Sequence, residues 1–349
     1  MINNSFFSTE ILRWFRENGR DLPWRETRDP YAIWLSEIIL QQTRIAQGWE
    51  YWERFMQTYP KVEDLAAASE DDVLKLWQGL GYYSRARNLH AAAKQIVALG
   101  SFPNTLDGIK SLKGVGDYTA AAIGSFAFDI PAAVVDGNVY RVLSRYFGID
   151  TPINSTQGKK EFAALAQSLL PASDAASYNQ GMMDFGAIQC TPQSPKCLLC
   201  PLAETCEALR CGRVEELPVK NKTVKVKTRH LSYIYIRCKS SVADGAGNTE
   251  PMVAIHRRGE GDIWQGLWEP YNVSDVKELP PFVKNPILLA KDVKHVLTHR
   301  ILLADFYLLE TETCPQLPDD YIWIRESEIE DYGVPRLIEI MLEKINPAE

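Results

Sequence analysis

The sequence predicts two domains, an all-helical N-terminal domain and a smaller α+β C-terminal domain. The chain has 349 residues, more than twice the roughly 150 residues of a typical domain. Apolar residues recur at helical spacing from Thr9 to about Leu209, whereas strand-like alternation begins near His230. With 46% apolar and 24% charged residues, the composition is that of a globular protein, which excludes disordered, collagen-like and coiled-coil classes.

Short helices joined by tight turns are expected over residues 1–211. Ile33, Trp34 and Ile38 illustrate the spacing of three and four residues that puts apolar side chains on one helix face. Proline and glycine mark the turns between these helices. The turn segments are Leu22-Pro23, Tyr59-Pro60, Gly79-Leu80-Gly81, Phe102-Pro103 and Gly114-Val115-Gly116.

Residues 212–229 are expected to be a linker, and residues 230–349 the second domain. The basic run Lys220–Arg229 carries five positive charges, which fits either a contact with a phosphate backbone or a solvated tether. Alternation and short apolar runs then predict an antiparallel or mixed sheet followed by a final helix. The predicted elements are strands at Leu231–Cys238, Met252–His256 and Ile301–Leu309, and a helix at about Pro335–Ile345.

The net charge of −7 argues at first against a polyanionic partner, since nucleic-acid binding depends on Lys and Arg. However, Met1–Arg229 contains 26 basic and 25 acidic residues, and His230–Glu349 contains 12 and 20. The acidity therefore belongs to the C-terminal domain. The longest apolar stretch, Tyr118–Val135, is broken by Asp129 and is too polar for a membrane span. Without an export signal either, we expect an intracellular protein, in the cytoplasm or nucleoid of a bacterium.

A glycine-rich turn, Leu112–Ile123, separates two predicted short helices. Gly114 and Gly116 would expose backbone amides at a helix N-terminus, where unsatisfied donors and the helix dipole favour phosphate. A Gly-x-Gly pair alone is also compatible with a plain turn between helices. Followed by Thr119, Ala120 and Ile123, it resembles the helix-hairpin-helix motif of DNA-repair proteins.

Two carboxylates stand out against apolar surroundings. Asp136 precedes a helix whose buried face includes Val139, Val142 and Leu143, so it is either a simple N-cap or a group held near a ligand. Glu37 lies in the apolar segment Trp34–Thr43, so it is either a surface residue or a buried carboxyl with a raised pKa.

Four of the seven cysteines, Cys190, Cys197, Cys200 and Cys206, fall in one short segment. In a chain without an export signal, this clustering favours a metal site over a disulfide framework. Four thiolates can bind zinc or an iron–sulfur cluster, and spacing alone does not separate the two. The other three cysteines are scattered and suggest no role.

Taken together, these motifs resemble the MutY-type adenine DNA glycosylases of the endonuclease III superfamily. The cysteine spacing resembles the [4Fe-4S] loop of that superfamily. The resemblance implies excision of adenine mispaired with 8-oxoguanine or guanine in duplex DNA, by base flipping and acid-assisted hydrolysis. We expect duplex DNA with an 8-oxoguanine:adenine mispair as the partner and a monomeric enzyme. Segments that carry the resemblance include Leu22–Arg25, Trp34–Thr43, Gly79–Leu89, Asp136–Val142 and Tyr178–Asp184.

The resemblance also implies residue roles. Glu37 would protonate adenine and Asp136 would stabilise the oxocarbenium ion, with Tyr118 and Asn138 positioning Asp136. The adenine pocket and the contacts with the duplex would use further side chains. The implied pocket residues are Trp24, Arg25, Leu40 and Gln180, the wedges are Gln42 and Tyr82, and the residues near the lesion are Thr43 and Leu80.

The C-terminal domain is expected to be a Nudix-like lesion-recognition module. Arg257–Pro270 resembles a Nudix loop, but the glutamate-rich metal helix does not follow, which disfavours a nucleotide pyrophosphatase. Family members contact 8-oxoguanine through a Phe-Ser-His segment. Here Leu297, Thr298 and His299 correspond to it, and simple core packing of this segment is the alternative.

Two other functions remain open from the sequence. A bifunctional endonuclease III-like lyase needs a hairpin lysine to form a Schiff base, and Tyr118 stands at that place. A non-catalytic iron–sulfur DNA sensor would require the Glu37 and Asp136 pair to be incidental.

Overall fold

The computed structural model describes residues 4–171, 173–221, 226–243, 249–274 and 281–346. The chain divides into two compact units, Met1–Ala67 with Ala91–Lys222, and Ala68–His90 with Thr223–Glu349. The domain boundaries expected from the sequence do not anticipate that residues 68–90 group with the C-terminal part. Each unit is described below by itself.

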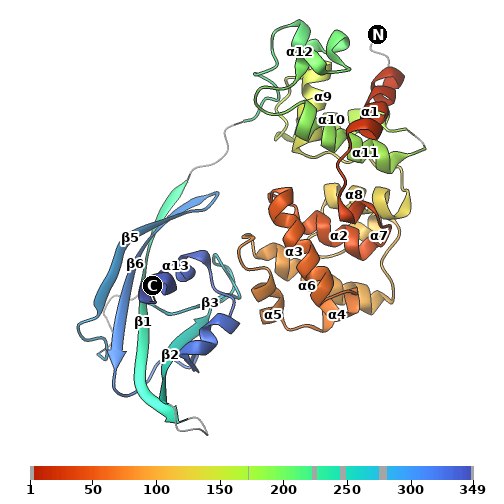
Figure 1. The fold of residues 1–349 in the computed structure, drawn as a ribbon. Coiled ribbons are helices and arrows are strands. Elements are labelled where there is room, and N and C mark those ends of the chain that lie inside the picture. Colours follow the sequence, from red (N-terminus) through yellow and green to blue (C-terminus); the bar gives the residue numbers. More distant parts are fainter. Residues whose placement is uncertain (1–3, 172, 222–225, 244–248, 275–280, 347–349) are drawn as a thin grey trace. The chain divides into compact units, whose positions relative to one another are not determined.

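The first unit is helical, as predicted (Figure 1). Side chains at the N-caps fix several helix starts; for example, Asp29 accepts a hydrogen bond of 3.0 Å from the Tyr31 amide. The helix α6 (Ser84–Leu99) is shared between the units. The remaining elements of the first unit are α1 (Asn4–Asn18), η1 (Pro23–Arg25), α2 (Pro30–Ile39), α3 (Ile45–Thr58), α4 (Val62–Ala67), α7 (Leu106–Lys110), α8 (Asp117–Phe128), α9 (Gly137–Phe147), α10 (Thr156–Leu169), α11 (Ala175–Asp184), η2 (Phe185–Gln189), η3 (Cys197–Leu199), η4 (Ala203–Thr205) and α12 (Glu207–Arg210).

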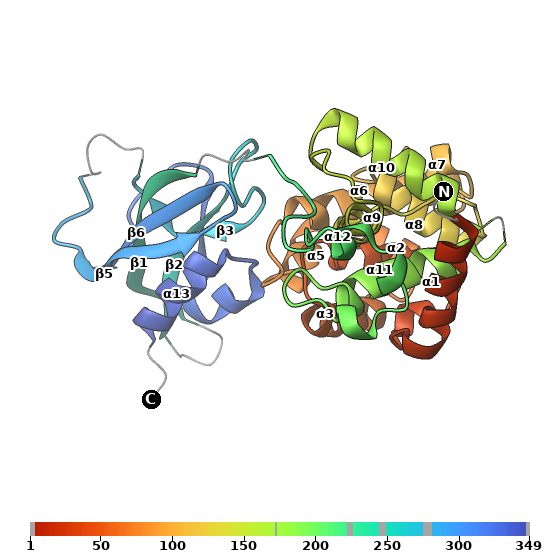
Figure 2. The ribbon, with the colours of Figure 1, turned by 90° about the horizontal axis from the view of Figure 1, so that it is seen from above.

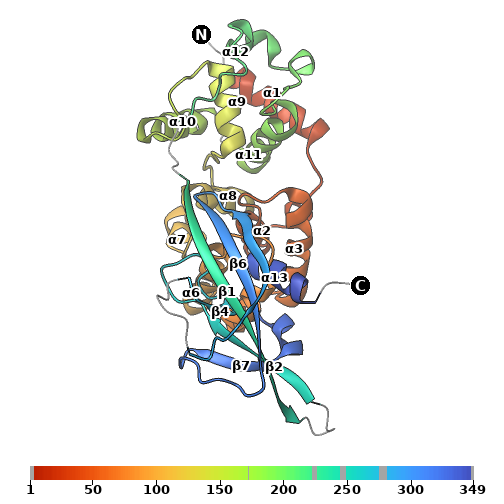
Figure 3. The same cartoon turned by 90° about the vertical axis from the view of Figure 1, so that its left-hand side faces the viewer.

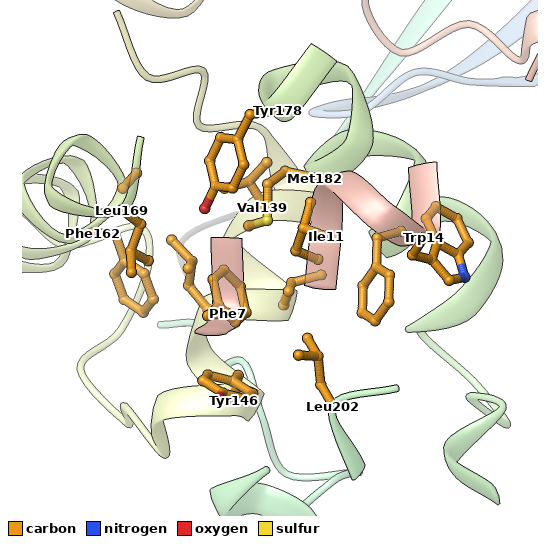
Figure 4. Packing of buried hydrophobic residues seen from close by; sticks show 14 of the residues in the cluster. Phe7, Ile11, Trp14, Val139, Tyr146, Phe162, Leu169, Tyr178, Met182 and Leu202 are labelled. Carbon is orange, nitrogen blue, oxygen red and sulfur yellow. The ribbon is translucent and has the colours of Figure 1, made fainter. Parts of the chain in front are cut away.

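A hydrophobic core joins α1 to α9, α10 and α11 (Figure 4). Phe7 of α1 packs against Tyr146 of α9, with ring centroids 4.6 Å apart. The predicted apolar face of α9 is buried, and Gly148 ends this helix in the left-handed region with φ 69°. Leu202 brings the cysteine-rich segment into the same core, so the fold of this segment depends on the helices.

The second unit contains a mixed seven-stranded sheet within the residues that the structure describes. Its central strands, β1 and β6, run parallel, whereas the other pairs are antiparallel (Figure 3). The strand order is β3-β2-β1-β6-β5, with β4 also paired to β1 and β7 to β2. The strands are β1 (Lys227–Ala243), β2 (Thr249–Arg257), β3 (Trp268–Glu269), β4 (Tyr271–Asn272), β5 (Ile287–Val296), β6 (Arg300–Thr311) and β7 (Tyr321–Arg325).

Alternate residues of β1 face two different cores, as a strand period of two requires. Tyr233 and Tyr235 pack beneath α13 (Arg336–Ile345), which lies against one face of the sheet (Figure 2), whereas Ile234 and Ile236 lie in the opposite core. The short helix η5 (Glu326–Asp331) precedes α13. The predicted strands and final helix are therefore confirmed.

The predicted linker 212–229 needs a correction at its end. Lys227–Arg229 form the first residues of β1, because Lys227 pairs with Arg300 in the parallel ladder with β6. The Lys222–Lys225 part of the predicted linker lies outside the described residues.

Within the second unit, α5 (Glu70–Leu76) and the start of α6 pack against the sheet domain. Arg257 forms ion pairs with Glu70 (2.9 Å) and Asp71 (3.1 Å). Arg87 donates a hydrogen bond of 2.6 Å to the Gln265 carbonyl. These contacts explain why residues 68–90 group with the C-terminal residues. In the described part of the chain, no helix has the length and apolarity that a membrane span requires.

Candidate active site

Glu37 lies in the most apolar helix of the first unit. Every residue of α2 from Tyr31 to Ile39 is buried, and Glu37 is only 6% exposed. Its Oε2 atom accepts a hydrogen bond of 2.7 Å from the Tyr118 hydroxyl. Burial raises the pKa of Glu37 to about 7, with a further contribution from Asp136, against lowering by Tyr118 and Arg25. A carboxyl that is half protonated near neutral pH is suited to donate a proton.

Asp136 is the N-cap of α9, as one of the two sequence interpretations expected. Its Oδ1 atom accepts hydrogen bonds from the amides of Asn138 (2.8 Å) and Val139 (2.7 Å), and Oδ2 accepts one of 2.7 Å from Asn138 Nδ2. Burial raises the pKa of Asp136, but these hydrogen bonds and the Arg141 charge oppose the rise. The other interpretation, a carboxylate held near a ligand, is compatible with the capping role, because the capped carboxylate also faces a cavity.

That cavity has a volume of about 430 Å³ and is lined by residues far apart in the sequence. It brings Glu37, Asp136 and Tyr118 together, so the predicted catalytic carboxylates share one site. Two neutral amides and an aliphatic side chain complete its wall. The lining residues are Glu37, Leu40, Gln41, Gln42, Tyr118, Asp136 and Gly137.

The other predicted adenine-pocket residues do not line this cavity. Trp24 is buried against Trp49 and Trp52, with ring centroids 5.9 and 5.7 Å away. The Arg25 guanidinium binds the carboxylate of Asp184 through two hydrogen bonds of 2.8 Å. Gln180 lies half-buried on α11. The resemblance implied no role for Asp184.

The predicted hairpin forms between α7 and α8. Gly114 adopts φ 77°, a conformation that glycine tolerates without strain. Gly116 is the N-cap of α8 and has no side chain to cap it, so the first amides of α8 lack that partner. Both glycines are exposed. The backbone geometry expected for a phosphate contact is therefore present, and Tyr118 extends from the same helix start to Glu37.

Arg141 connects Asp136 to the cysteine-rich segment. Its Nη2 atom donates to Asn138 Oδ1 (2.8 Å) and to the Gly186 carbonyl (2.7 Å), while Nε donates to the Cys190 carbonyl (2.7 Å). The fit is close, since a Cβ atom at Gly186 would lie 2.6 Å from Asn138 Cβ. Sequence reasoning missed Arg141, because its partners lie 45 and 49 residues away along the chain.

The four clustered cysteines line a common cavity with Arg145. Arg145 Nη1 lies 3.4 Å from Cys190 Sγ and donates 2.7 Å to the Thr191 carbonyl, which places a positive charge beside the thiols. Among the described residues, no three His, Cys, Asp or Glu side chains converge as one metal ion requires. In a multi-iron cluster each thiolate binds its own iron. A thiol set around one cavity therefore fits an iron–sulfur cluster.

The second unit carries the predicted wedge Tyr82 and the predicted lesion contacts. Tyr82 is 45% exposed, and its hydroxyl forms a hydrogen bond with the Thr298 hydroxyl. Both line a cavity of about 520 Å³ that also includes Leu80 and His299. Thr298 and His299 are exposed on the β5–β6 turn, whereas Leu297 packs against the core. Leu297 also lines this cavity, so its position fits both core packing and the predicted lesion contact.

Two predicted DNA contacts share an unusual backbone conformation. Gln42 and Tyr82 have φ values of 57° and 48° although neither is glycine. Such residues cost conformational energy and concentrate at functional sites. Thr43 follows Gln42 and is half-buried. No sequence pattern indicated this backbone strain.

Comparisons with known proteins match the regions described above. Residues 35–171 match the HhH-GPD superfamily base excision DNA repair protein family, residues 190–206 match the iron-sulfur binding domain of endonuclease III, and residues 247–344 match the NUDIX domain. The expected helix-hairpin-helix, iron–sulfur and Nudix-like regions are therefore confirmed.

One of the relatives extends the match over nearly the whole chain, and two others cover about 60% of it. Adenine DNA glycosylase of Buchnera aphidicola subsp. Acyrthosiphon pisum is 39% identical over 349 residues, which is 97% of both chains. Adenine DNA glycosylase of Mus musculus is 42% identical over 226 residues, 61% of this chain and 44% of the mouse protein. The structure of a thermostable thymine-DNA glycosylase superposes with a TM-score of 0.56 at 34% identity, covering 60% of this chain and 97% of that one.

Proposed function

This chain belongs to the adenine DNA glycosylase family, and from that premise we propose that it removes adenine paired with 8-oxoguanine or guanine in duplex DNA. Membership makes it a base excision repair glycosylase, a hydrolase of N-glycosyl bonds, with a [4Fe-4S] cluster in the 190–206 segment. The observation that carries the mechanism is Glu37, a buried carboxyl with a pKa near 7 in the same cavity as Asp136.

The proposed reaction needs an acid and a stabilising anion. Glu37 donates its proton to adenine N7, which weakens the bond between N9 and C1′ and lets the neutral base leave. Asp136, which lines the same cavity, would stabilise the cationic sugar with its negative charge. Water then adds to C1′ and returns a proton to the Glu37 carboxylate, so the net reaction consumes one water.

The surrounding residues support these two groups. Tyr118 was expected to position Asp136, but its hydroxyl donates to Glu37 and would orient that carboxyl, whereas Asn138 holds Asp136 through its amide and side chain, as expected. Trp24, Arg25, Leu40 and Gln180 are proposed to contact the adenine. Cys190, Cys197, Cys200 and Cys206 would hold the cluster, whose iron–sulfur core would cross-link this segment without entering the reaction.

DNA binding is proposed to combine backbone and side-chain contacts. The amides after Gly114 and Gly116 would contact phosphate, and Gln42 and Tyr82 would enter the space left by the flipped adenine. Thr43, Leu80, Leu297, Thr298 and His299 would contact the opposite base, and the enzyme would act as a monomer.

An excision assay tests this proposal. The chain is incubated in excess with duplexes in which adenine faces 8-oxoguanine, guanine or thymine, and abasic product is measured by alkaline cleavage. We expect rapid excision opposite 8-oxoguanine, slower excision opposite guanine, and none opposite thymine. Wild-type protein that makes no abasic product opposite 8-oxoguanine contradicts the proposal. Borohydride should trap no covalent adduct, because the Tyr118 phenol cannot form an imine.

A further inference from the structure

Thr298 and His299 are the two central residues of a tight hairpin turn between β5 and β6. The Leu297 amide donates 2.8 Å to the Arg300 carbonyl, and the Arg300 amide donates 3.4 Å to the Leu297 carbonyl. The Lys227 amide, at the start of β1, donates 3.2 Å to the His299 carbonyl. The predicted lesion contacts are thus held by a defined backbone, and Arg300 follows them directly as the first residue of β6.

Arg300 lines the cavity of about 520 Å³ that Tyr82 and Thr298 also line. Alternate residues after it on β6, Leu302 and Ala304, are buried in the core beneath α13, so the Arg300 side chain leaves the sheet on that face. Arg300 itself lies beyond the end of this core, and 43% of its side-chain surface is exposed. Its guanidinium group is therefore accessible and belongs to the wall of the cavity that carries the predicted lesion contacts.

The ion pairs around Asp262 hold Arg300 less firmly than its two neighbouring arginines. Arg229 Nη1 donates 2.7 Å to each carboxylate oxygen of Asp262, and Arg258 Nη2 donates 2.6 Å to Oδ2. Arg300 Nη1 lies 3.6 Å from Asp262 Oδ1, which is longer than an ordinary hydrogen bond. Arg258 is also paired with the buried Glu269. In this network three arginines share two carboxylates, which leaves one positive charge in excess beside the cavity.

This excess positive charge lies in an acidic part of the chain. His230–Glu349 contains 12 basic and 20 acidic residues, so this part as a whole does not attract DNA and a contact must be local. Each phosphate of a duplex carries a negative charge, and an arginine can bind a phosphate through two parallel hydrogen bonds. The accessible and weakly held guanidinium of Arg300 is suited to that contact, whereas Asp262 already engages Arg229 and Arg258.

We propose that Arg300 binds a phosphate of the lesion strand, next to the nucleotide opposite the adenine, and so anchors the Thr298–His299 turn against that nucleotide. This inference rests on the proposed recognition of the opposite base by the turn. The contact is independent of base identity, because phosphate contacts position a protein on the duplex whereas base contacts specify the sequence. An arginine fork on the N7 and O6 edge of the opposite base is the alternative, and it predicts a different result in the same experiment.

The test is the salt dependence of duplex affinity, measured by fluorescence anisotropy between about 0.05 and 0.3 M salt. Adenine faces either 8-oxoguanine or guanine, and a 2′-fluoro group on the adenosine sugar blocks hydrolysis by destabilising the cationic sugar. Arg300→Gln should weaken the binding of both duplexes equally, by roughly 3- to 10-fold, and should reduce the slope of log affinity against log salt by about one. Arg300→Lys retains the charge and should restore the slope.

A matched control substitutes an arginine toward the other end of the same sheet. Arg325 is exposed and pairs with Met252 of β2, which in turn pairs with Cys238 of β1. Arg300 pairs with Lys227, the first residue of β1. At about 3.3 Å per residue, the two arginines are separated by roughly 35 Å along the strand direction. Arg325→Gln should leave the slope unchanged. Thermal unfolding checks that each variant folds, and Arg300→Met replaces Arg300→Gln if the latter does not fold.

The outcomes separate the inference from the proposed function. If Arg300→Gln leaves the salt slope unchanged, or weakens only the 8-oxoguanine duplex, the inference is wrong. An equal loss of slope in Arg325→Gln also contradicts it, because the effect would then come from net charge alone. If wild-type protein binds the duplexes but removes no adenine from hydrolysable ones, the proposed function fails, and the slopes still decide the phosphate contact. Wild-type protein that binds neither duplex contradicts both.

Discussion

In the first unit Glu37 is 6% exposed within an apolar helix, whereas in the second unit Tyr82 is 45% exposed beside a turn. The first environment changes what a side chain does, because burial raises the pKa of Glu37 to about 7. In the second, the hydroxyls of Tyr82 and Thr298 form a hydrogen bond with each other on exposed side chains. Under the proposed function, bond breaking would depend on a buried group and lesion recognition on exposed groups, so substitutions in the two units should damage different measurable properties.

The largest effect should come from Asp136→Asn. The variant keeps a capping oxygen for α9 but loses the charge that stabilises the cationic sugar. Single-turnover excision should fall about 1,000-fold, while duplex affinity, measured by fluorescence anisotropy, should change less than about 3-fold. A comparable fall in affinity would mean that Asp136 acts in binding, which would remove the contrast between the units.

Burial of Glu37 should lower the free energy of unfolding of the wild-type protein at alkaline pH. The pKa of Glu37 rises from 4.5 to about 7 on folding, so ionisation favours the unfolded chain as pH rises through this interval. Wild-type protein therefore loses stability between about pH 4.5 and 7 from this group. At pH 8, Glu37→Gln should be more stable than wild type by roughly 2 to 3 kcal/mol, with little difference at pH 4.5. Urea unfolding at the two pH values measures this, and a variant less stable at pH 8 would contradict the assigned environment.

Asn138→Ala should have an intermediate effect. Its half-buried side chain joins Asp136 to Arg141, and a hydrogen bond to a charged group contributes about 1.5 to 3 kcal/mol. Excision should slow by roughly 10- to 100-fold, with the absorbance of the iron–sulfur cluster retained. Loss of the cluster absorbance instead would show that the link through Arg141 mainly supports the cysteine-rich segment.

Thr298→Ala should have the smallest effect, and it should change the preference for the opposite base more than the rate of excision. Removing one neutral hydrogen bond costs about 1 kcal/mol, so the preference for 8-oxoguanine over guanine opposite adenine should fall by about 5-fold. The excision rate opposite guanine should stay near wild type, and Thr298→Ser should keep the preference. If both duplexes slow equally, Thr298 contributes to general binding, and the two units are less separate in function than proposed.

Local patterns in the sequence predicted the elements well, because helix periodicity, caps and turns depend on neighbouring residues. Asp136 as an N-cap, Gly148 as a helix end and the strand at Leu231–Cys238 are examples. The parallel pairing of β1 with β6 could not be predicted, since it joins residues about 70 positions apart. The grouping of residues 68–90 with the sheet domain depends on contacts at a similar or greater distance.

In the candidate site, too, some residues could be predicted from the sequence, whereas others depend on contacts between distant parts of the chain. Family resemblance indicated Glu37, Asp136 and Tyr118, and the structure places them around one cavity. It did not indicate how Arg25 is oriented, because its partner Asp184 lies 159 residues later. Nor did apolar spacing around Glu37 give its degree of burial, which depends on helices from several parts of the chain. The residues that tune a site are harder to find than those that react, because their effect comes entirely from tertiary contacts.

Gly186 has a consequence for judging inherited or laboratory variants. It carries no functional group and would contact no DNA in the proposed reaction, so a survey of reacting groups would pass over it. A single added methyl group would nevertheless meet the backbone of Asn138 at 2.9 to 3.0 Å and push the first turn of α9, with Asp136, out of place. A variant at this position in η2 should therefore be classed with variants of the catalytic residues, not with tolerated changes away from the site.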